Sequence, residues 1–257
     1  MECGTIALTA LAAGDLLNDT SFLDGLFRRW ARRVPVSEED KRALLTLPWQ
    51  RKAYPRDSYL AREGDSTTVC TLLLSGLAFR QKLVSDGARQ IISFHIPGEF
   101  LDLQNTLLEV ADHNVQCLTR CTVAAIAKSA LVQLMQERPS VRHAIWLDSL
   151  LDASVFREWV VNLGRRDARQ RIAHLLCELA ARLKASGVSG GDIYDFPITQ
   201  EQIGDATGLT AVHTNRTLQG LRKEGLISLS LSKLTILDWD ALADVGDFNE
   251  RYLHHAV

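Results

Sequence analysis

The sequence predicts an α+β protein in which an antiparallel β domain, a long helix and a small C-terminal helical domain follow one another. Several apolar runs of five or six residues, separated by glycine turns between residues 51 and 127, indicate the β domain. Apolar residues that recur every four positions between residues 138 and 164 indicate the long helix. Two short helical segments around Gly208, followed by a strict alternation of apolar and polar residues, indicate the C-terminal domain.

The composition is that of a globular protein with room for two domains. Of the 257 residues, 46% are hydrophobic and 23% are charged, and the formal net charge is −2. Between residues 165 and 233, however, ten basic residues stand against seven acidic ones. No stretch approaches the length of a membrane span, and the first residues include Glu2 and lack the basic start of a signal peptide. We therefore expect a cytoplasmic protein without membrane association.

The five cysteines are odd in number and irregular in spacing, which predicts free thiols in a reducing compartment. Cys117 and Cys121 fall in one apolar run, residues 115–126, that is typical of a strand. Four strand residues separate two Cα atoms by roughly 13 Å, which is beyond the reach of a disulfide.

The N-terminal third is expected to change from helix to strand. Residues 1–36 are predicted to be an extension that is helical in part, with Phe22, Leu26 and Trp30 at helical spacing. A capped helix opens at Ser37, with Asp40 in its first turn. Residues 37–137 then form the β domain, whose strands are expected near residues 71–75, 78–83, 90–96 and 115–126.

The long helix, residues 138–164, carries two apolar stripes, which indicates two packing partners. One stripe should cover the β domain, and the other should pair with the same helix of a second copy as a short coiled coil. We assign the pairing role to Leu147, Leu151, Val155, Trp159 and Leu163. A core helix of a monomer is the alternative interpretation. Gly164 is expected to be the hinge to the last domain, residues 165–257.

The stretch from residue 199 to 227 predicts a helix-turn-helix. Thr199 and Gln202 have the spacing of a capping box, and Gly208 can adopt the left-handed conformation that ends the first helix. Thr210 caps the second helix, and Gly225 ends it. This unit places a second helix in the major groove of DNA.

Helical geometry divides the second helix into two faces. Thr214, Thr217, Leu218 and Leu221 share the side that can be buried. The opposite side carries Arg216, Asn215, Gln219 and Val212, which we predict to contact bases: Arg suits guanine, Asn and Gln suit adenine, and Val suits a thymine methyl. His213, Thr199 and Thr210 are better placed for phosphates. An ordinary amphipathic surface helix is the alternative.

The residues after this helix alternate between apolar and polar from Leu226 to Leu237, which predicts a hairpin with its turn near residues 230–233. Helix, turn, helix and hairpin together form a winged helix-turn-helix.

With these features the chain resembles the CRP/FNR family of bacterial transcription regulators. The C-terminal match rests on Thr199, the segment 202–204, Gly208, Asn215, Arg216, Leu218 and the segment 225–227; the N-terminal match rests on Gly64, Gly76, Gly87 and the segment 94–100. The resemblance covers roughly residues 37–240. It implies an N-terminal β-roll (a double-stranded β-helix) of the cyclic-nucleotide-binding type, a long dimerisation helix and a C-terminal winged helix. It also implies a homodimer on a palindromic promoter site, with double-stranded DNA and RNA polymerase as partners.

The resemblance also identifies departures from the family. Arg216 matches the family's most regular base-reading arginine, but Val212 stands where the family often has a glutamate that reads cytosine. Other residues occupy the positions of the family's cyclic-AMP contacts. Asp102 and Leu103 replace a Gly-Glu pair, and Ala111 and Asp112 replace an Arg-Ser pair. Phe156 and Arg157 replace the polar pair that contacts adenine. We therefore do not expect cyclic AMP, and Asp102, Leu103, Phe156 and Arg157 mark the candidate pocket of an unknown effector. An iron–sulfur cluster is not expected, since only Cys3 lies in the N-terminal cysteine region.

Two further alternatives concern cofactor and function. His95 could ligate haem, as histidines do in some family members, although we favour a structural histidine before a tight turn. The domain pair could also be a scaffold for protein contacts without DNA binding. No nucleophile–base pair, metal triad or phosphate-binding loop is evident, so we expect neither a metal site nor an enzyme.

Overall fold

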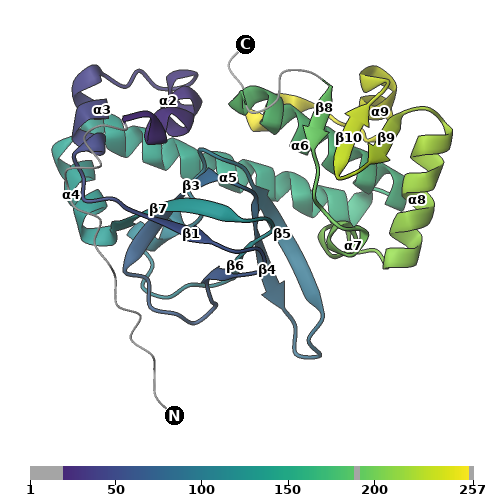
Figure 1. The fold of residues 1–257 in the computed structure, drawn as a ribbon, viewed down its shortest axis with the longest axis horizontal. Helices are drawn as coiled ribbons and strands as arrows, with labels where there is room; N and C mark the ends of the chain where they lie inside the picture. The colour runs from purple at the N-terminus through teal and green to yellow at the C-terminus, as the bar shows by residue number, and fades with distance from the viewer. Residues whose placement is uncertain (1–19, 188–191, 255–257) are drawn as a thin grey trace.

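The fold places a β-roll and a small helical domain side by side along one long helix (Figure 1). The structure, a computed structural model, describes residues 20–187 and 192–254. The long helix, α5 (Pro139–Arg165), runs behind the roll from the N-terminal helices to the C-terminal domain.

The β-roll consists of two antiparallel sheets in the strand orders β1-β7-β3 and β2-β6-β4-β5. Its elements are η1 (Thr20–Leu23), α2 (Asp24–Ala31), α3 (Glu38–Leu45), β1 (Gln50–Tyr54), β2 (Tyr59–Ala61), β3 (Val69–Ser75), β4 (Ala78–Leu83), β5 (Arg89–His95), η2 (Leu103–Thr106), β6 (Asn114–Cys117), β7 (Cys121–Ala127) and α4 (Lys128–Glu137). The expected α+β architecture is confirmed.

The predicted strand over residues 115–126 is in fact two strands, β6 and β7, that lie in different sheets. Cys117 and Cys121 therefore flank a turn, and the argument that held them roughly 13 Å apart along one strand is wrong. Both are free and buried, as are Cys70 and Cys177. Cys3 lies outside the described residues.

The N-terminal helices belong to the core of the roll. Ser37 accepts a hydrogen bond from Asp40 N, and the Asp40 carboxylate accepts one from Ser37 N, so the predicted cap is present. Leu26 and Trp30 are buried in one cluster with Ile145 of α5. The described part of the predicted extension thus packs against the long helix, whereas residues 1–19 lie outside the described ranges.

The long helix begins at Pro139, where the missing N–H leaves no hydrogen bond unmade, and it continues to Arg165. The dimer stripe assigned from the sequence is wrong in part. Leu151 and Trp159 are each 5% exposed within the monomer, and Leu147, Val155 and Leu163 are half-buried. The exposed apolar residues of α5 are instead Trp146, Leu150, Phe156, Val160 and Val161.

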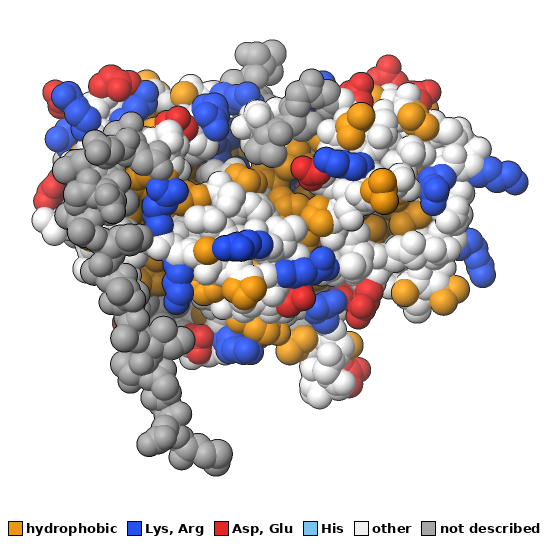
Figure 2. All heavy atoms as spheres, in the orientation of Figure 1, with side chains coloured by type: hydrophobic (Ala, Val, Ile, Leu, Met, Phe, Trp, Pro, Cys, Tyr) orange, Lys and Arg blue, Asp and Glu red, His pale blue; other side chains and the backbone are white. Residues whose placement is uncertain are grey.

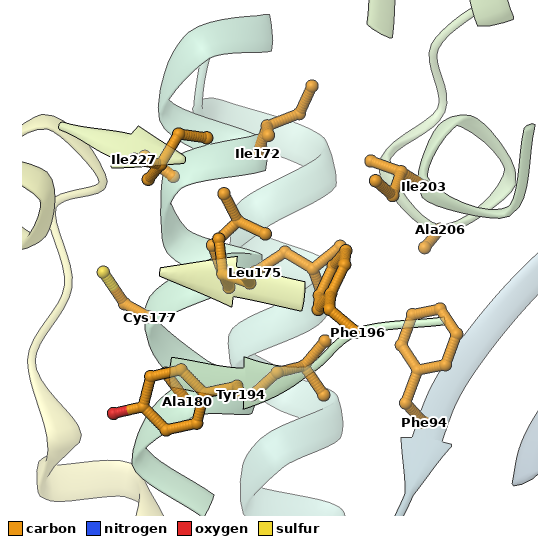
Figure 3. Close-up of a cluster of buried hydrophobic side chains, with 14 of the residues drawn as sticks. Phe94, Ile172, Leu175, Cys177, Ala180, Tyr194, Phe196, Ile203, Ala206 and Ile227 are labelled. Carbon is orange, nitrogen blue, oxygen red and sulfur yellow. The ribbon is translucent and has the colours of Figure 1, made fainter. Parts of the chain in front are cut away.

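The C-terminal domain surrounds α6 (Ala168–Ser186), whose apolar residues face a small sheet of order β8-β10-β9 (Figure 3). Its further elements are β8 (Ile193–Asp195), α7 (Gln200–Thr207), α8 (Ala211–Lys223), β9 (Ile227–Ser230), β10 (Lys233–Ile236), α9 (Trp239–Val245) and η3 (Glu250–Leu253). The predicted hairpin is present, since Ser230 pairs with Lys233. Strand β8 and the closing elements α9 and η3 were not predicted.

The chain does not break at Gly164. Helix α5 ends one residue later, and the backbone becomes extended at Arg166 and Asp167 before α6. The Arg166 side chain is buried, and its Nη2 lies 2.7 Å from Glu158 Oε1 and donates to Asp247 O at 3.1 Å. The helix therefore continues through Gly164, and the hinge motion expected there stays a prediction.

Candidate nucleic-acid interface

The helix-turn-helix is held together by reciprocal caps and a close glycine contact. Thr199 Oγ1 accepts from Gln202 N at 3.2 Å, and Gln202 Oε1 accepts from Thr199 N at 2.9 Å. Gly208 has a φ of +67°, which ends α7 in the left-handed region. A Cβ at Gly204 would lie 2.5 Å from Leu209 O, so this residue lets the turn pack onto α7. These contacts fix the angle at which α8 leaves the domain.

The two predicted faces of α8 are present in the structure. Thr214, Leu218 and Leu221 are buried, and Thr217 is half-buried. The other face is exposed and holds the residues predicted to contact bases: Val212, Asn215, Arg216 and Gln219. The sequence therefore identified correctly which side of this helix reaches solvent.

The predicted phosphate contacts lie at the N-termini of the two helices. Thr199 and Thr210 are the N-caps of α7 and α8, and Thr210 Oγ1 accepts from His213 N at 3.3 Å. All three side chains are exposed. Helix N-termini carry unpaired N–H groups and a positive partial charge, which suit a phosphate.

One contact joins the two helices across the exposed surface. Asn215 Nδ2 donates to Gln200 Oε1 at 2.8 Å. Gln200 is the first residue of α7, so the N-terminus of α7 lies beside the exposed face of α8. Figure 2 shows basic side chains at the right edge of the molecule, where α8 lies in Figure 1. This arrangement brings the residues predicted to contact bases and those predicted to contact phosphates onto one surface.

A second feature is a partly open polar cavity of about 140 Å³ between the β-roll, α2, α5 and α6. Four guanidinium groups line it, from Arg29, Arg33, Arg80 and Arg182, together with three carboxylates, from Glu99, Asp148 and Asp152. With His95 neutral, these lining groups sum to one positive charge.

The effector residues predicted from the sequence are only partly at this cavity. Leu103 lines it. Asp102 is buried beside it but accepts a hydrogen bond from Thr71 N at 2.6 Å, and burial raises the pKa of its carboxyl to about 7. Phe156 is 50% exposed and Arg157 is also exposed, on the opposite side of α5. Their assignment to the pocket is wrong, because α5 presents Asp152 and Val155 to the cavity instead.

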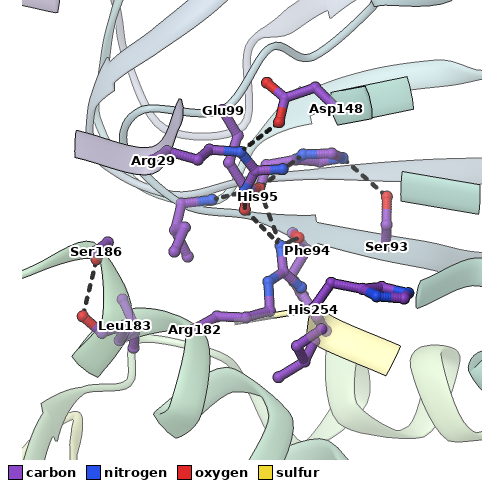
Figure 4. Close-up of polar contacts among 12 residues, drawn as sticks. Arg29, Ser93, Phe94, His95, Glu99, Asp148, Arg182, Leu183, Ser186 and His254 are labelled. Atoms are coloured by element: carbon purple, nitrogen blue, oxygen red, sulfur yellow. Dashed lines mark hydrogen bonds and ion pairs between the residues drawn. The ribbon is translucent and has the colours of Figure 1, made fainter. Parts of the chain in front are cut away.

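A chain of ion pairs crosses the junction where the β-roll, α2, α5 and α6 meet (Figure 4). Arg182 of α6 lies 2.9 Å from Glu99 of the β-roll, and Arg29 of α2 lies 2.8 Å from the same carboxylate. Arg29 Nε also donates to Asp148 of α5 at 2.9 Å. Burial acts to raise the pKa of Glu99, but the charges of Arg182 and Arg29 hold that pKa well below its usual value. These four residues link all three parts of the molecule.

Sequence reasoning missed the four junction residues because they come from distant segments. The available signal was charge in apolar surroundings: Glu178 and Arg182 interrupt the apolar face of α6, and Arg80 interrupts the strand β4. Such charges are rarely buried unless they are paired.

His95 has a structural setting. Its Nε2 lies 2.9 Å from Ser93 Oγ, and its Nδ1 lies 3.2 Å from Glu99 Oε2. Burial and the charge of Arg80 lower its pKa to about 4. The cavity beside it is smaller than the roughly 300–1,000 Å³ typical of ligand pockets. The surroundings of His95 therefore do not fit haem.

The part of the chain that the structure describes holds neither a cluster of metal-binding side chains nor a membrane-spanning helix. Among residues 20–187 and 192–254, no three His, Cys, Asp or Glu side chains are grouped in a way that could hold a metal ion. Within the same ranges, no helix is both long and apolar enough to cross a bilayer.

Comparisons with known proteins agree with this geometry. Residues 170–245 match the Crp-like helix-turn-helix domain, and residues 51–138 match the cyclic nucleotide-binding domain. The nitrogen fixation regulation protein FixK of Bradyrhizobium diazoefficiens is 32% identical over 177 residues, which are 68% of this chain and 73% of FixK. The chain belongs to the CRP/FNR family.

Other members of the CRP/FNR family are also similar to this chain, in sequence and in structure. The transcriptional activator protein FnrL of Cereibacter sphaeroides is 26% identical over 201 residues, which are 76% of this chain and 80% of FnrL. The structure of FixK2 from Bradyrhizobium japonicum has a TM-score of 0.72 at 22% identity, and the match covers 77% of this chain and 98% of FixK2. The fold is therefore that of the family, and the chain is a DNA-binding transcription regulator.

Proposed function

We propose that this CRP/FNR regulator acts as a homodimer that reads a palindromic promoter site through the exposed face of α8. The observation that carries the proposal is that face itself, in which Asn215, Arg216 and Gln219 point to solvent from a helix fixed by the caps at Thr199 and Thr210. Guanidinium and amide groups at this spacing suit the edges of base pairs in a major groove.

The dimer is supported by the free apolar side of α5. Trp146 and Leu150 are 56% and 63% exposed, and Val160 is 57% exposed. Together with Ala153 and Arg157 these positions follow spacings of four, three, four and three residues, which is the repeat of a coiled-coil seam. A second copy packed on this side would bring two α8 helices to one duplex, as a twofold-symmetric site requires.

Selection from a pool of random duplexes tests the proposal. The expected product is a twofold-symmetric sequence whose half-sites are centred about one helical turn apart. Enrichment of nothing, or of a single unpaired half-site, contradicts it. If the folded protein binds no DNA, the alternative function, a scaffold for protein contacts, is favoured.

A small-ligand sensor is the second candidate, and the polar cavity favours it. The excess of one positive charge and the volume of about 140 Å³ suit a small anion better than a cyclic nucleotide. Small carboxylic acids, tested singly in a thermal shift assay, should include one that raises Tm in the parent but not in Arg33→Ala. If every shift persists in that variant, the cavity is not the site.

The remaining partners follow from the family. We place the regulator in the cytoplasm, where RNA polymerase contacts it when it is bound at the promoter. We assign it no catalytic role. Transcription with purified polymerase should change when this protein is added to a template carrying the selected site, and an unchanged transcript level would contradict this assignment.

A further inference from the structure

The turn of the hairpin β9–β10 exposes a leucine that neither packing nor local conformation explains. Leu231 is 95% exposed. It also has a φ of +49°, and Ser232 follows at +59°, so the two-residue turn has positive φ at both positions. Such turns favour Asn-Gly or Asp-Gly, and a branched apolar side chain is disfavoured in the left-handed region. Leu231 therefore weakens the hairpin and gains no burial in return.

Hydrogen bonds place this turn on the same side of the domain as the exposed face of α8. Phe196 N donates to Ser232 O at 2.8 Å, which ties the turn to the segment that leads into α7. Thr199, the N-cap of α7, is three residues further on, within about 11 Å. The next residue, Gln200, accepts from Asn215 on the exposed face of α8. The turn, the α7 N-terminus and the base-reading face thus follow one another along one surface.

The residues beside the leucine can bind a nucleic-acid backbone. Ser230, Ser232 and Lys233 are exposed and offer two hydroxyls and an ammonium group. In the free protein Lys233 pairs with Asp195, but both side chains are more than half exposed, so exchange of this partner for a phosphate costs little. An apolar tip between polar donors suits the minor groove, whose width is about 6 Å.

We propose that Leu231 enters the minor groove next to the half-site read by α8 and there selects for an easily deformed base step. This rests on the proposed DNA-binding function and adds a contact outside the helix-turn-helix. Apolar side chains that insert between base pairs partly unstack them, and pyrimidine–purine steps yield most readily. Sequence preference would therefore extend beyond the bases that α8 touches.

Leu231→Asn tests the proposal because it should lower DNA affinity without lowering stability. Asparagine suits the first position of this turn, so Tm should stay the same or rise. Affinity for the selected site should fall about tenfold. Since leucine is uncharged, the dependence of affinity on salt should stay that of the parent, whereas a lost phosphate contact would reduce the slope by about one. Leu231→Phe should retain the affinity.

Two measurements complete the test. Selection with random bases flanking the half-sites should enrich a pyrimidine–purine step with the parent and not with Leu231→Asn. Leu237→Asn is the matched control, because Leu237 is 58% exposed in the same domain but beyond the end of the hairpin, and it should bind as the parent does.

The outcomes separate this inference from the function on which it rests. If Leu231→Asn has the same affinity and the same preference for flanking bases as the parent, the inference is wrong, but the proposed base contacts of α8 are unaffected. If Leu231→Asn lowers affinity only by lowering Tm, the inference is also wrong. A parent protein that selects no site overturns both.

Discussion

Val212 is an exposed residue that we expect to set part of the sequence preference. It is 72% exposed on the reading face of α8, in the first turn of the helix. A carboxylate at this position can accept a hydrogen bond from cytosine N4, whereas valine offers only apolar contact to a thymine methyl. We therefore expect this residue to affect base readout, although it does not contribute to the core.

Val212→Glu should change specificity without loss of stability. We expect one position of the selected half-site to change towards cytosine, with discrimination of about 1–3 kcal/mol, measured by selection and competition binding. The unfolding midpoint should stay that of the parent. An unchanged site preference would mean that Val212 does not face a base.

Asp102 is a residue whose charge is unfavourable in the fold. Burial raises its pKa from 3.8 to about 7, and the hydrogen bond from Thr71 N offsets this only in part. Well below the unfolded-chain pKa of 3.8 the carboxyl is protonated in both the folded and the unfolded chain, so it has no effect. As pH rises towards 7 the unfolded chain ionises first, and the folded state loses relative stability.

Asp102→Asn should therefore stabilise the protein in a pH-dependent way. The gain in unfolding free energy should be close to zero near about pH 3 and roughly 2–4 kcal/mol at about pH 7.5. Urea unfolding at both pH values measures it, and the difference between variant and parent cancels the opposite contributions of His95 and His174. A gain that is equal at both pH values would contradict the assignment.

At the scale of elements, much of the C-terminal domain could be predicted because its signals are local. The caps at Thr199 and Thr210, the glycine turn and the alternation in the hairpin each act within a few residues. The break between β6 and β7 was missed, because β-branched and apolar residues continue close to the turn on both sides. The faces of α5 could not be assigned, because both apolar stripes are regular and only tertiary packing decides which is covered.

The exposed apolar side of α5 leads to a prediction about dimerisation. Leu150→Asp places a charge on the side proposed to be paired, so the protein should elute as a monomer where the parent is a dimer, as measured by light scattering. Its helix content should be retained, since Leu150 is 63% exposed in the single chain. Leu107→Asp, at a loop residue that is 79% exposed, should remain dimeric.

On the scale of the whole molecule, the ion-pair chain joins the β-roll to the DNA-binding domain. Arg182 of α6 and Arg29 of α2, which are far apart in sequence, both pair with the carboxylate of Glu99 in the β-roll. Removing one partner leaves buried charges uncompensated, which costs about 3–5 kcal/mol. Charges within apolar stretches indicate that such side chains are paired, but the sequence does not identify the partners, because these depend on how the domains meet.

Glu99→Gln should accordingly lower stability by about 3–5 kcal/mol and divide unfolding into separate transitions of the two domains, measured by calorimetry. Glu63→Gln is the matched control, since Glu63 pairs with Lys82 at an exposed site and its loss should cost at most about 1 kcal/mol. Equal effects of the two substitutions would show that the junction does not hold the domains together.

The central claim is that Arg216 reads a base from the exposed face of α8. Competition binding of the parent and Arg216→Ala to the selected site, and to sites in which each guanine is replaced in turn, tests it most directly. The parent should prefer one guanine by about 1–3 kcal/mol, and Arg216→Ala should lose that preference while keeping those at other positions. If Arg216→Ala discriminates among the sites as the parent does, then Arg216 is not a base-reading residue.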